Sequence, residues 1–205
     1  MDYFNETERA KQKAFASWRD TFLAPLSDTL IRCRIRPYHI TIFAVLLLLA
    51  GSSLPVLDHW LTVSILLFSY CVLDGLDGPV ARRMQIDNEG GAMLDIAADQ
   101  AGVAFVAAAA TWHLGSNPIG AVLFASSYLS FIPLAIYANQ KKVTIWTFIR
   151  IKYFFYFVYC VSGLFQYDFV QYLMMLFAAY YSFYLLHALY RIYRHHLHGG
   201  QGAAS

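Results

Sequence analysis

Four aspartates with helical spacing stand out between residues 73 and 99. Asp74 and Asp77 are three residues apart, and Asp95 and Asp99 are four apart. Both spacings place the two carboxylates of a pair on one face of an α-helix. Carboxylates that are packed together repel one another and need compensation. Divalent cations such as Mg²⁺, Mn²⁺ or Ca²⁺ bind hard oxygen ligands of this kind. The four aspartates therefore predict a site for one or two divalent ions, provided that the two helix faces meet.

The composition shows which elements must position these aspartates. The chain has 205 residues, of which 59% are hydrophobic and only 14% are charged, whereas soluble domains carry about 25% charged residues. The apolar residues come in runs long enough to cross a bilayer. The sequence therefore predicts an all-α integral membrane protein. The six expected transmembrane helices cover residues 40–57, 60–76, 92–114, 118–138, 144–165 and 169–190.

The distribution of positive charge supports this topology. Of the 15 lysines and arginines, thirteen precede the first span or follow the second, fourth and sixth spans. The remaining two, Arg150 and Lys152, fall inside the fifth expected span. By the positive-inside rule, both termini and the aspartates lie on the cytoplasmic side.

Two segments flank the expected six-helix domain, which covers residues 40–190. The first flanking segment covers residues 1–39. Within it, apolar residues recur at close to helical spacing between charged ones over residues 5–36, which favours an amphipathic juxtamembrane helix on the cytoplasmic face. A charged helix with no special role is the alternative. Residues 191–205 are polar and glycine-rich towards their end, and we expect a disordered cytoplasmic tail.

The second and third expected spans are consecutive and antiparallel, so both aspartate pairs can meet at one level just inside the membrane. Acidic residues within membrane spans are usually functional. Single aspartates that solvate helix ends would explain Asp74 or Asp77 alone, but not four carboxylates at a matched depth. Gly78 and Gly91 leave room for a ligand to approach. Arg82 is placed to hold a diphosphate through charge-assisted hydrogen bonds. Pro79 suggests that a helix restarts there.

These residues form a longer pattern: Asp74-x-x-Asp77-Gly78-x-x-Ala81-Arg82, then eight residues, then Gly91-x-x-x-Asp95-x-x-x-Asp99. The pattern resembles the signature of the CDP-alcohol phosphotransferase family at all eight positions. Residues 37–41, Pro-Tyr-His-Ile-Thr, are similar to the Pro-Asn-x-Ile/Leu-Thr that the family often has before its first span. Tyr38 replaces the usual Asn there, and Gln100 stands where many members carry a basic residue, so the sequence assigns no subfamily.

The resemblance implies a reaction and roles for residues. Family members transfer a substituted phosphate from a CDP-linked donor to an alcohol and release CMP. By resemblance, Asp74, Asp77 and Asp95 are metal ligands, while Asp99 shares the metal and takes the proton from the acceptor. The residues implied to contact the cytidine diphosphate are Asp74, Gly78, Ala81, Arg82, Gly91 and Thr41. The implied cofactor is Mg²⁺ or Mn²⁺, for which Ca²⁺ can substitute structurally. A homodimer in the lipid bilayer is implied, and no nucleic acid is expected as a partner.

The acceptor site rests on the two cations inside the fifth expected span. Arg150 and Lys152 stand six and eight residues into it, about 9–12 Å along a helix, and cations inside a span usually face a cavity or a partner. They are about 200° apart around a helix, so we expect only one to face the site. The hypothesis is that Arg150, with Lys141 or Lys142, binds an anionic group on the acceptor. Snorkelling to the interface is the alternative.

An anionic acceptor favours glycerol 3-phosphate, inositol phosphate or serine, with CDP-diacylglycerol as the donor. Two other functions stay open. One is a CDP-choline or CDP-ethanolamine type of reaction with a lipid acceptor. The other is a divalent-cation transporter, which would explain the acids but not the spacing of Gly78, Ala81 and Arg82. Metal-dependent release of CMP would separate the enzyme from the transporter.

Overall fold

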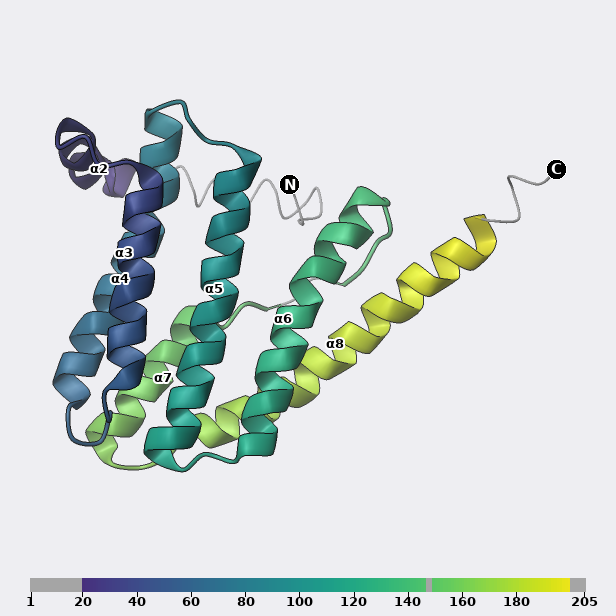
Figure 1. Ribbon diagram of the computed structural model, residues 1–205. Helices are drawn as coiled ribbons and strands as arrows, with labels where there is room; N and C mark the ends of the chain where they lie inside the picture. The colour runs from purple at the N-terminus through teal and green to yellow at the C-terminus, as the bar shows by residue number, and fades with distance from the viewer. Residues whose placement is uncertain (1–19, 147–148, 200–205) are drawn as a thin grey trace.

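The computed structural model describes residues 20–146 and 149–199, and all regular structure in these residues is helical (Figure 1). The helices are α2 (Ala24–Arg32), α3 (Pro37–Ser53), α4 (Trp60–Arg83), α5 (Glu89–Ala109), the π-helical turn η1 (Ala110–Leu114), α6 (Pro118–Gln140), α7 (Lys152–Phe165) and α8 (Val170–Gly199). Helix α4 packs against α3 and α7, α5 packs against α3 and α6, and α8 crosses behind α6.

Four of these segments are long and apolar enough to cross a membrane: α4, α5 together with η1, α6, and Val170–Leu197 of α8. Helices α2 and α3 pass the same test only as a pair, and they are bent by 108° relative to each other. Helix α7 has only 14 residues. The prediction of an all-helical membrane protein is therefore confirmed. Length and composition support four or five spans, and the predicted number of six is not confirmed.

The ends of the central helices follow from local sequence signals. The side chain of Asn88 precedes α5 and accepts a hydrogen bond of 2.9 Å from the backbone N–H of Gly91. Asn117 precedes α6 in the same way, and it accepts bonds from the backbone of Ile119 and Gly120. Side-chain caps of this kind satisfy backbone N–H groups that have no partner within the helix. They fix the start of α5, the helix that carries both Asp95 and Asp99.

The sequence suggested that a helix restarts at Pro79. Instead, the proline lies inside α4, which continues to Arg83. A proline restricts the preceding residue through a clash that involves that residue's Cβ atom. The preceding residue here is Gly78, which has no Cβ. The uninterrupted helix carries Asp74, Asp77 and Arg82 on one rigid element.

The fifth expected span, 144–165, also differs, since α7 begins only at Lys152. The described residues just before it have no regular secondary structure, and Ile149 is bound to α8: its backbone N–H donates to the Tyr180 hydroxyl, and the Tyr181 hydroxyl donates to its carbonyl at 2.9 Å. This stretch is rich in β-branched residues, which lose side-chain freedom in a helix. Arg150 therefore lies outside the helix, and the expectation that it stands six residues into it is wrong.

The flanking segments are partly described. Helix α2 lies within the expected juxtamembrane segment, and residues 1–19 lie outside the described residues, so an amphipathic helix over 5–36 stays a prediction. At the other end, α8 runs to Gly199 and projects beyond the rest of the bundle (Figure 1). The tail expected to be disordered from residue 191 is thus helical up to that point, and residues 200–205 are not described.

The largest side chains of the core are aromatic. Phe124 of α6 lies 4.9 Å from Phe155 of α7 and 5.9 Å from Tyr181 of α8, measured between ring centroids. The outer surface is also apolar: Phe68 is 71% exposed and Trp112 is 85% exposed. Exposed side chains of this size would be unfavourable in water but suit a lipid environment.

Candidate active site

Three of the four predicted metal ligands meet between α4 and α5. Asp74, Asp95 and Asp99 each offer one carboxylate oxygen, and these three oxygens lie within 4.8 Å of one another. Oxygen ligands stand about 2.0–2.6 Å from Mg²⁺ or Ca²⁺, so oxygens on opposite sides of one ion are roughly 4–5 Å apart. The spacing and the hard oxygen donors therefore fit a divalent ion.

The fourth aspartate, Asp77, is oriented by neighbours within the protein. Its Oδ2 accepts a hydrogen bond of 2.7 Å from the Thr41 hydroxyl, and its Oδ1 accepts one of 2.6 Å from the backbone N–H of Gly78. The side chain is buried. The residue is one helical turn from Asp74, as its spacing predicts, but it is not part of the group of three oxygens.

A lysine side chain bridges the two outer aspartates of the pattern. The Lys152 ammonium donates at 2.7 Å to Asp74 Oδ2 and also donates to Asp99 Oδ1. The side chains of Lys152 and Asp74 are each only 7% exposed. The cation inside the site is thus the first residue of α7, and Arg150, which the hypothesis favoured, is exposed.

Two tyrosines also contact these aspartates, Tyr70 from a buried position and Tyr153 from a half-exposed one. Tyr153 donates a hydrogen bond of 2.5 Å to Asp74 Oδ2, and Tyr70 donates one of 3.4 Å to Asp99 Oδ1. The sequence analysis missed both. Tyr70 stands one helical turn before Asp74, which is a spacing that could have indicated it. Tyr153 lies in the aromatic run 153–159, where nothing distinguishes it from a packing residue.

The residues that the family resemblance links to cytidine diphosphate line one cavity of about 400 Å³ at the ends of α3, α4 and α5. Five of the six implied contacts belong to its wall: Thr41, Gly78, Ala81, Arg82 and Gly91. Asp77 and Asp95 also line it. Asp95 therefore belongs both to this cavity and to the group of three oxygens, so that the two features form one continuous site.

The guanidinium of Arg82 is held by an aspartate that the sequence analysis did not consider. Arg82 Nε and Nη2 donate to the two oxygens of Asp20 at 2.9 and 2.8 Å. The arginine side chain is 43% exposed at the rim of the cavity. A second ion pair joins Arg83 to Asp28 of α2. The two pairs attach the chain before α3 to the end of α4.

The remaining cations expected at the acceptor site lie near the end of α6 and before α7. Lys141 and Lys142 follow α6 and are exposed, and the ammonium of Lys141 lies 5.9 Å from the centroid of the Tyr137 ring. Arg150 lies close enough to Asp95 for its charge to act on that carboxylate. Of these three cations, Arg150 is the one that the structure brings towards the aspartates.

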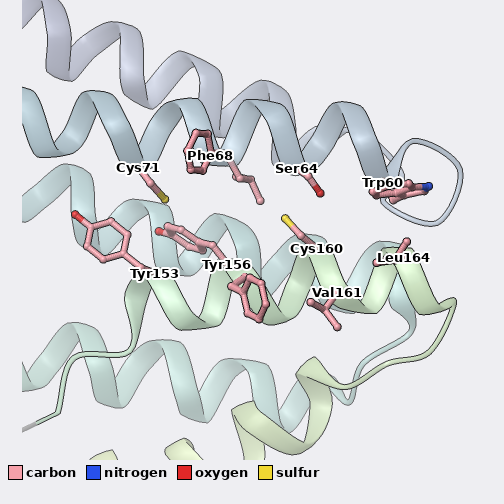
Figure 2. Close-up of a pocket in the computed structure, with 11 residues that line it drawn as sticks. Trp60, Ser64, Phe68, Cys71, Tyr153, Tyr156, Cys160, Val161 and Leu164 are labelled. Atoms are coloured by element: carbon pink, nitrogen blue, oxygen red, sulfur yellow. The ribbon is translucent and has the colours of Figure 1, made fainter. Parts of the chain in front are cut away.

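A second cavity, of about 470 Å³, lies between α4 and α7 and has an almost wholly apolar lining (Figure 2). We call it the α4–α7 groove. Its residues are Trp60, Ser64, Leu67, Phe68 and Cys71 of α4 and Tyr153, Tyr156, Phe157, Cys160, Val161 and Leu164 of α7. Tyr153 stands at the end opposite Trp60 (Figure 2). Since Tyr153 also contacts Asp74, the groove leads from the lipid-facing surface to the aspartates.

Comparisons with known proteins agree with this geometry. Two crystal structures of phosphatidylinositol phosphate synthase from Mycobacterium tuberculosis have the same fold, each at 17% sequence identity. One has CDP-DAG bound, with a TM-score of 0.67 over 82% of this chain and 92% of that chain. The other is a complex with manganese and citrate, with a TM-score of 0.69 over 82% and 88%. A search of curated proteins by sequence gave no match.

The family profile for CDP-alcohol phosphatidyltransferase matches residues 34–184. The match begins just before α3 and ends within α8, so it contains the four aspartates of the pattern, the residues that line the cavity at the ends of α3, α4 and α5, and Lys152. The chain belongs to the CDP-alcohol phosphatidyltransferase family.

Proposed function

We propose that the protein transfers the phosphatidyl group of CDP-diacylglycerol to the hydroxyl of a small alcohol and releases CMP. The observation that carries this proposal is the position of Asp95, which lines the cavity formed by the nucleotide-motif residues and also belongs to the group of three aspartate oxygens. A CDP moiety in that cavity would place its diphosphate beside the aspartates. The relative crystallised with CDP-DAG supports the donor.

The reaction forms one bond and breaks one. The acceptor oxygen bonds to the phosphorus that carries the diacylglycerol, and the bond from this phosphorus to the CMP oxygen breaks. Asp99 accepts the proton of the acceptor hydroxyl, since a carboxylate within hydrogen-bond reach can act as a general base. Arg82 contacts the diphosphate by charge-assisted hydrogen bonds. A divalent ion held by Asp74, Asp95 and Asp99 supplies neutralisation of the phosphate charge, and the relative with manganese supports this.

The α4–α7 groove is proposed to hold an acyl chain of the donor. Its lining is apolar, and it lies between α4, which is long enough to span a membrane, and the shorter apolar helix α7, so an acyl chain loses no hydrogen bonds on entering. Tyr153 joins the groove to Asp74, which lets a lipid have its chain in the groove and its phosphate at the aspartates.

The acceptor is proposed to carry an anionic group, as glycerol 3-phosphate, inositol phosphate and serine do. Lys152 is engaged by Asp74 and Asp99. Arg150, whose charge acts on Asp95, is proposed to contribute positive charge to the acceptor site, with Lys141 or Lys142. The charge distribution supports a site on the cytoplasmic side, and we expect a homodimer as in the family.

The test is CMP release by the purified protein in nanodiscs, with CDP-diacylglycerol, Mn²⁺ and each acceptor in turn. We expect turnover with one anionic acceptor and a loss of at least a hundredfold in Asp99→Asn, as for removal of a general base. Asp58→Asn, on an exposed aspartate between α3 and α4, is the matched control and should keep full activity. Turnover that is unchanged in Asp99→Asn would contradict the assigned base. Turnover only with CDP-choline or CDP-ethanolamine and diacylglycerol would contradict the assigned donor.

A further inference from the structure

Lys152 contacts the aspartates where a metal ion would also have to bind. Its ammonium donates to Asp74 Oδ2 at 2.7 Å and to Asp99 Oδ1. A divalent ion bound by the same two oxygens would stand within about 2.6 Å of each and would overlap the ammonium nitrogen. The lysine and a metal ion at this position therefore exclude each other.

Several contacts keep the lysine in place. Besides the two carboxylates, the ammonium lies 4.5 Å from the ring centroid of Tyr153 and 5.5 Å from that of Tyr70. Only 7% of the side chain is exposed. A buried cation loses its hydration and depends on such partners, and Lys152 begins α7, which is packed against α4 and α5. Movement out of the site would leave the buried carboxylate of Asp74 and the partly buried carboxylate of Asp99 without this charge.

Each carboxylate still has a second oxygen for a metal. A carboxylate offers about four lone-pair positions on two oxygens, so Asp74 and Asp99 can each bind Lys152 with one oxygen and an ion with the other, together with Asp95. Two-metal sites place their ions about 3.5–4 Å apart and share carboxylates between them. In this chain one of those two positions coincides with the ammonium.

We propose that Lys152 takes the place of one of two cations, so that each chain binds a single divalent ion at the aspartates. This inference rests on the proposed function, which requires a divalent ion there. It gives Lys152 a role that differs from contact with the acceptor: the lysine supplies fixed positive charge and orients Asp74 and Asp99 for the ion.

The test counts Mn²⁺ ions bound per chain, from the loss of the free Mn²⁺ signal in electron paramagnetic resonance, on the purified full-length protein. We expect one ion in the wild type and two in Lys152→Met, with a spectrum from two coupled ions appearing only in the variant. Lys142→Met, the same change at an exposed lysine, should still bind one. If Lys152→Met does not fold, Lys152→Gln removes the charge while its amide can still donate hydrogen bonds, and it should also bind two.

The possible results separate this inference from the proposed function. Two Mn²⁺ ions in the wild type would overturn the role of Lys152 and leave the metal requirement intact. A single ion in the folded Lys152→Met and Lys152→Gln variants would overturn it as well. Absence of Mn²⁺ binding in the folded wild type would overturn the metal requirement of the proposed function itself.

Discussion

Thr41 of α3 donates a hydrogen bond of 2.7 Å to Asp77 of α4, across 36 residues of sequence. Both side chains are buried, and both line the cavity at the ends of α3, α4 and α5. The bond joins the start of the first helix of the family match to the acidic pattern. It fixes Asp77 Oδ2, while the Gly78 N–H fixes Oδ1, so the orientation of this carboxylate is set by protein groups.

Replacement of Thr41 by Val should therefore reduce activity without removing any aspartate. Asp77 lines the cavity proposed to hold the CDP moiety beside the other aspartates, so a misoriented carboxylate should lower CMP release by about 10–100-fold, the range for groups that orient functional ligands. Thr41→Ser keeps the hydroxyl and serves as the control, with activity within about threefold of the wild type. Equal activity of the Val and Ser variants would show that the hydrogen bond does not orient Asp77 for the reaction.

Asp20→Asn should lower the KM for the CDP-linked donor. Asp20 holds the guanidinium of Arg82 at the rim of the cavity at the ends of α3, α4 and α5, and a bound diphosphate must compete with it. An exposed ion pair contributes about 0–1 kcal/mol, so the KM should fall by up to about fivefold in steady-state kinetics at low salt. Asp28→Asn breaks the neighbouring pair with Arg83, which does not line the cavity, and should leave the KM unchanged. A rise in the KM of Asp20→Asn would mean that Asp20 positions Arg82 instead of competing for it.

Ser64→Phe should discriminate between donors by the length of their acyl chains. The added ring would fill part of the α4–α7 groove (Figure 2). The kcat/KM for a long-chain donor should therefore fall about tenfold, which is the lower end of the discrimination that an apolar pocket provides between substrates. A short-chain donor should be used as well as by the wild type. The control is Ser126→Phe, on an exposed position of α6. Equal losses for long and short chains would exclude the groove as the acyl site.

Gly163→Ala should destabilise the bundle away from the site. A Cβ atom on Gly163 would lie 2.5 Å from Val56 Cγ2 and 2.7 Å from the Val56 carbonyl oxygen, and the backbone cannot give way easily. Overpacking of this kind costs about 1–3 kcal/mol, which a lower thermal midpoint in detergent would reveal. Gly120→Ala meets only the flexible Met175 side chain at 3.3 Å and should be nearly neutral. Similar midpoints for the two variants would contradict the close approach at Gly163.

The sequence predicted the elements that carry the acids because local signals define them. The expected segments 60–76, 92–114 and 118–138 overlap α4, α5 with η1, and α6. The start of α5 depends on Asn88, and that of α6 on Asn117 and Pro118. Helical spacing also placed Asp95 and Asp99 on one face, and the structure brings both to Asp74.

Contacts between distant residues account for what the sequence could not predict. Helix α7 begins at Lys152, and the residues just before it are held by Tyr180 and Tyr181, about thirty positions later. The choice of Lys152 over Arg150 as the buried cation follows from that start. Likewise, Asp77 turns towards Thr41 because α3 packs against α4, which no periodicity in either helix indicates.

The bridge from Lys152 to Asp74 and Asp99 also bears on how the protein is made. The hairpin of α4 and α5 carries all four aspartates, whereas the lysine follows 78 residues after Asp74 and 53 after Asp99. Ribosomes synthesise the chain from the N-terminus, so the acidic hairpin reaches the membrane before its own lysine exists. During this interval its charge has to be balanced by protons or metal ions from the surroundings. The pairing of Lys152 with the aspartates is therefore a late step of assembly. A chain that stops before α7 would expose an uncompensated acidic hairpin to cellular quality control.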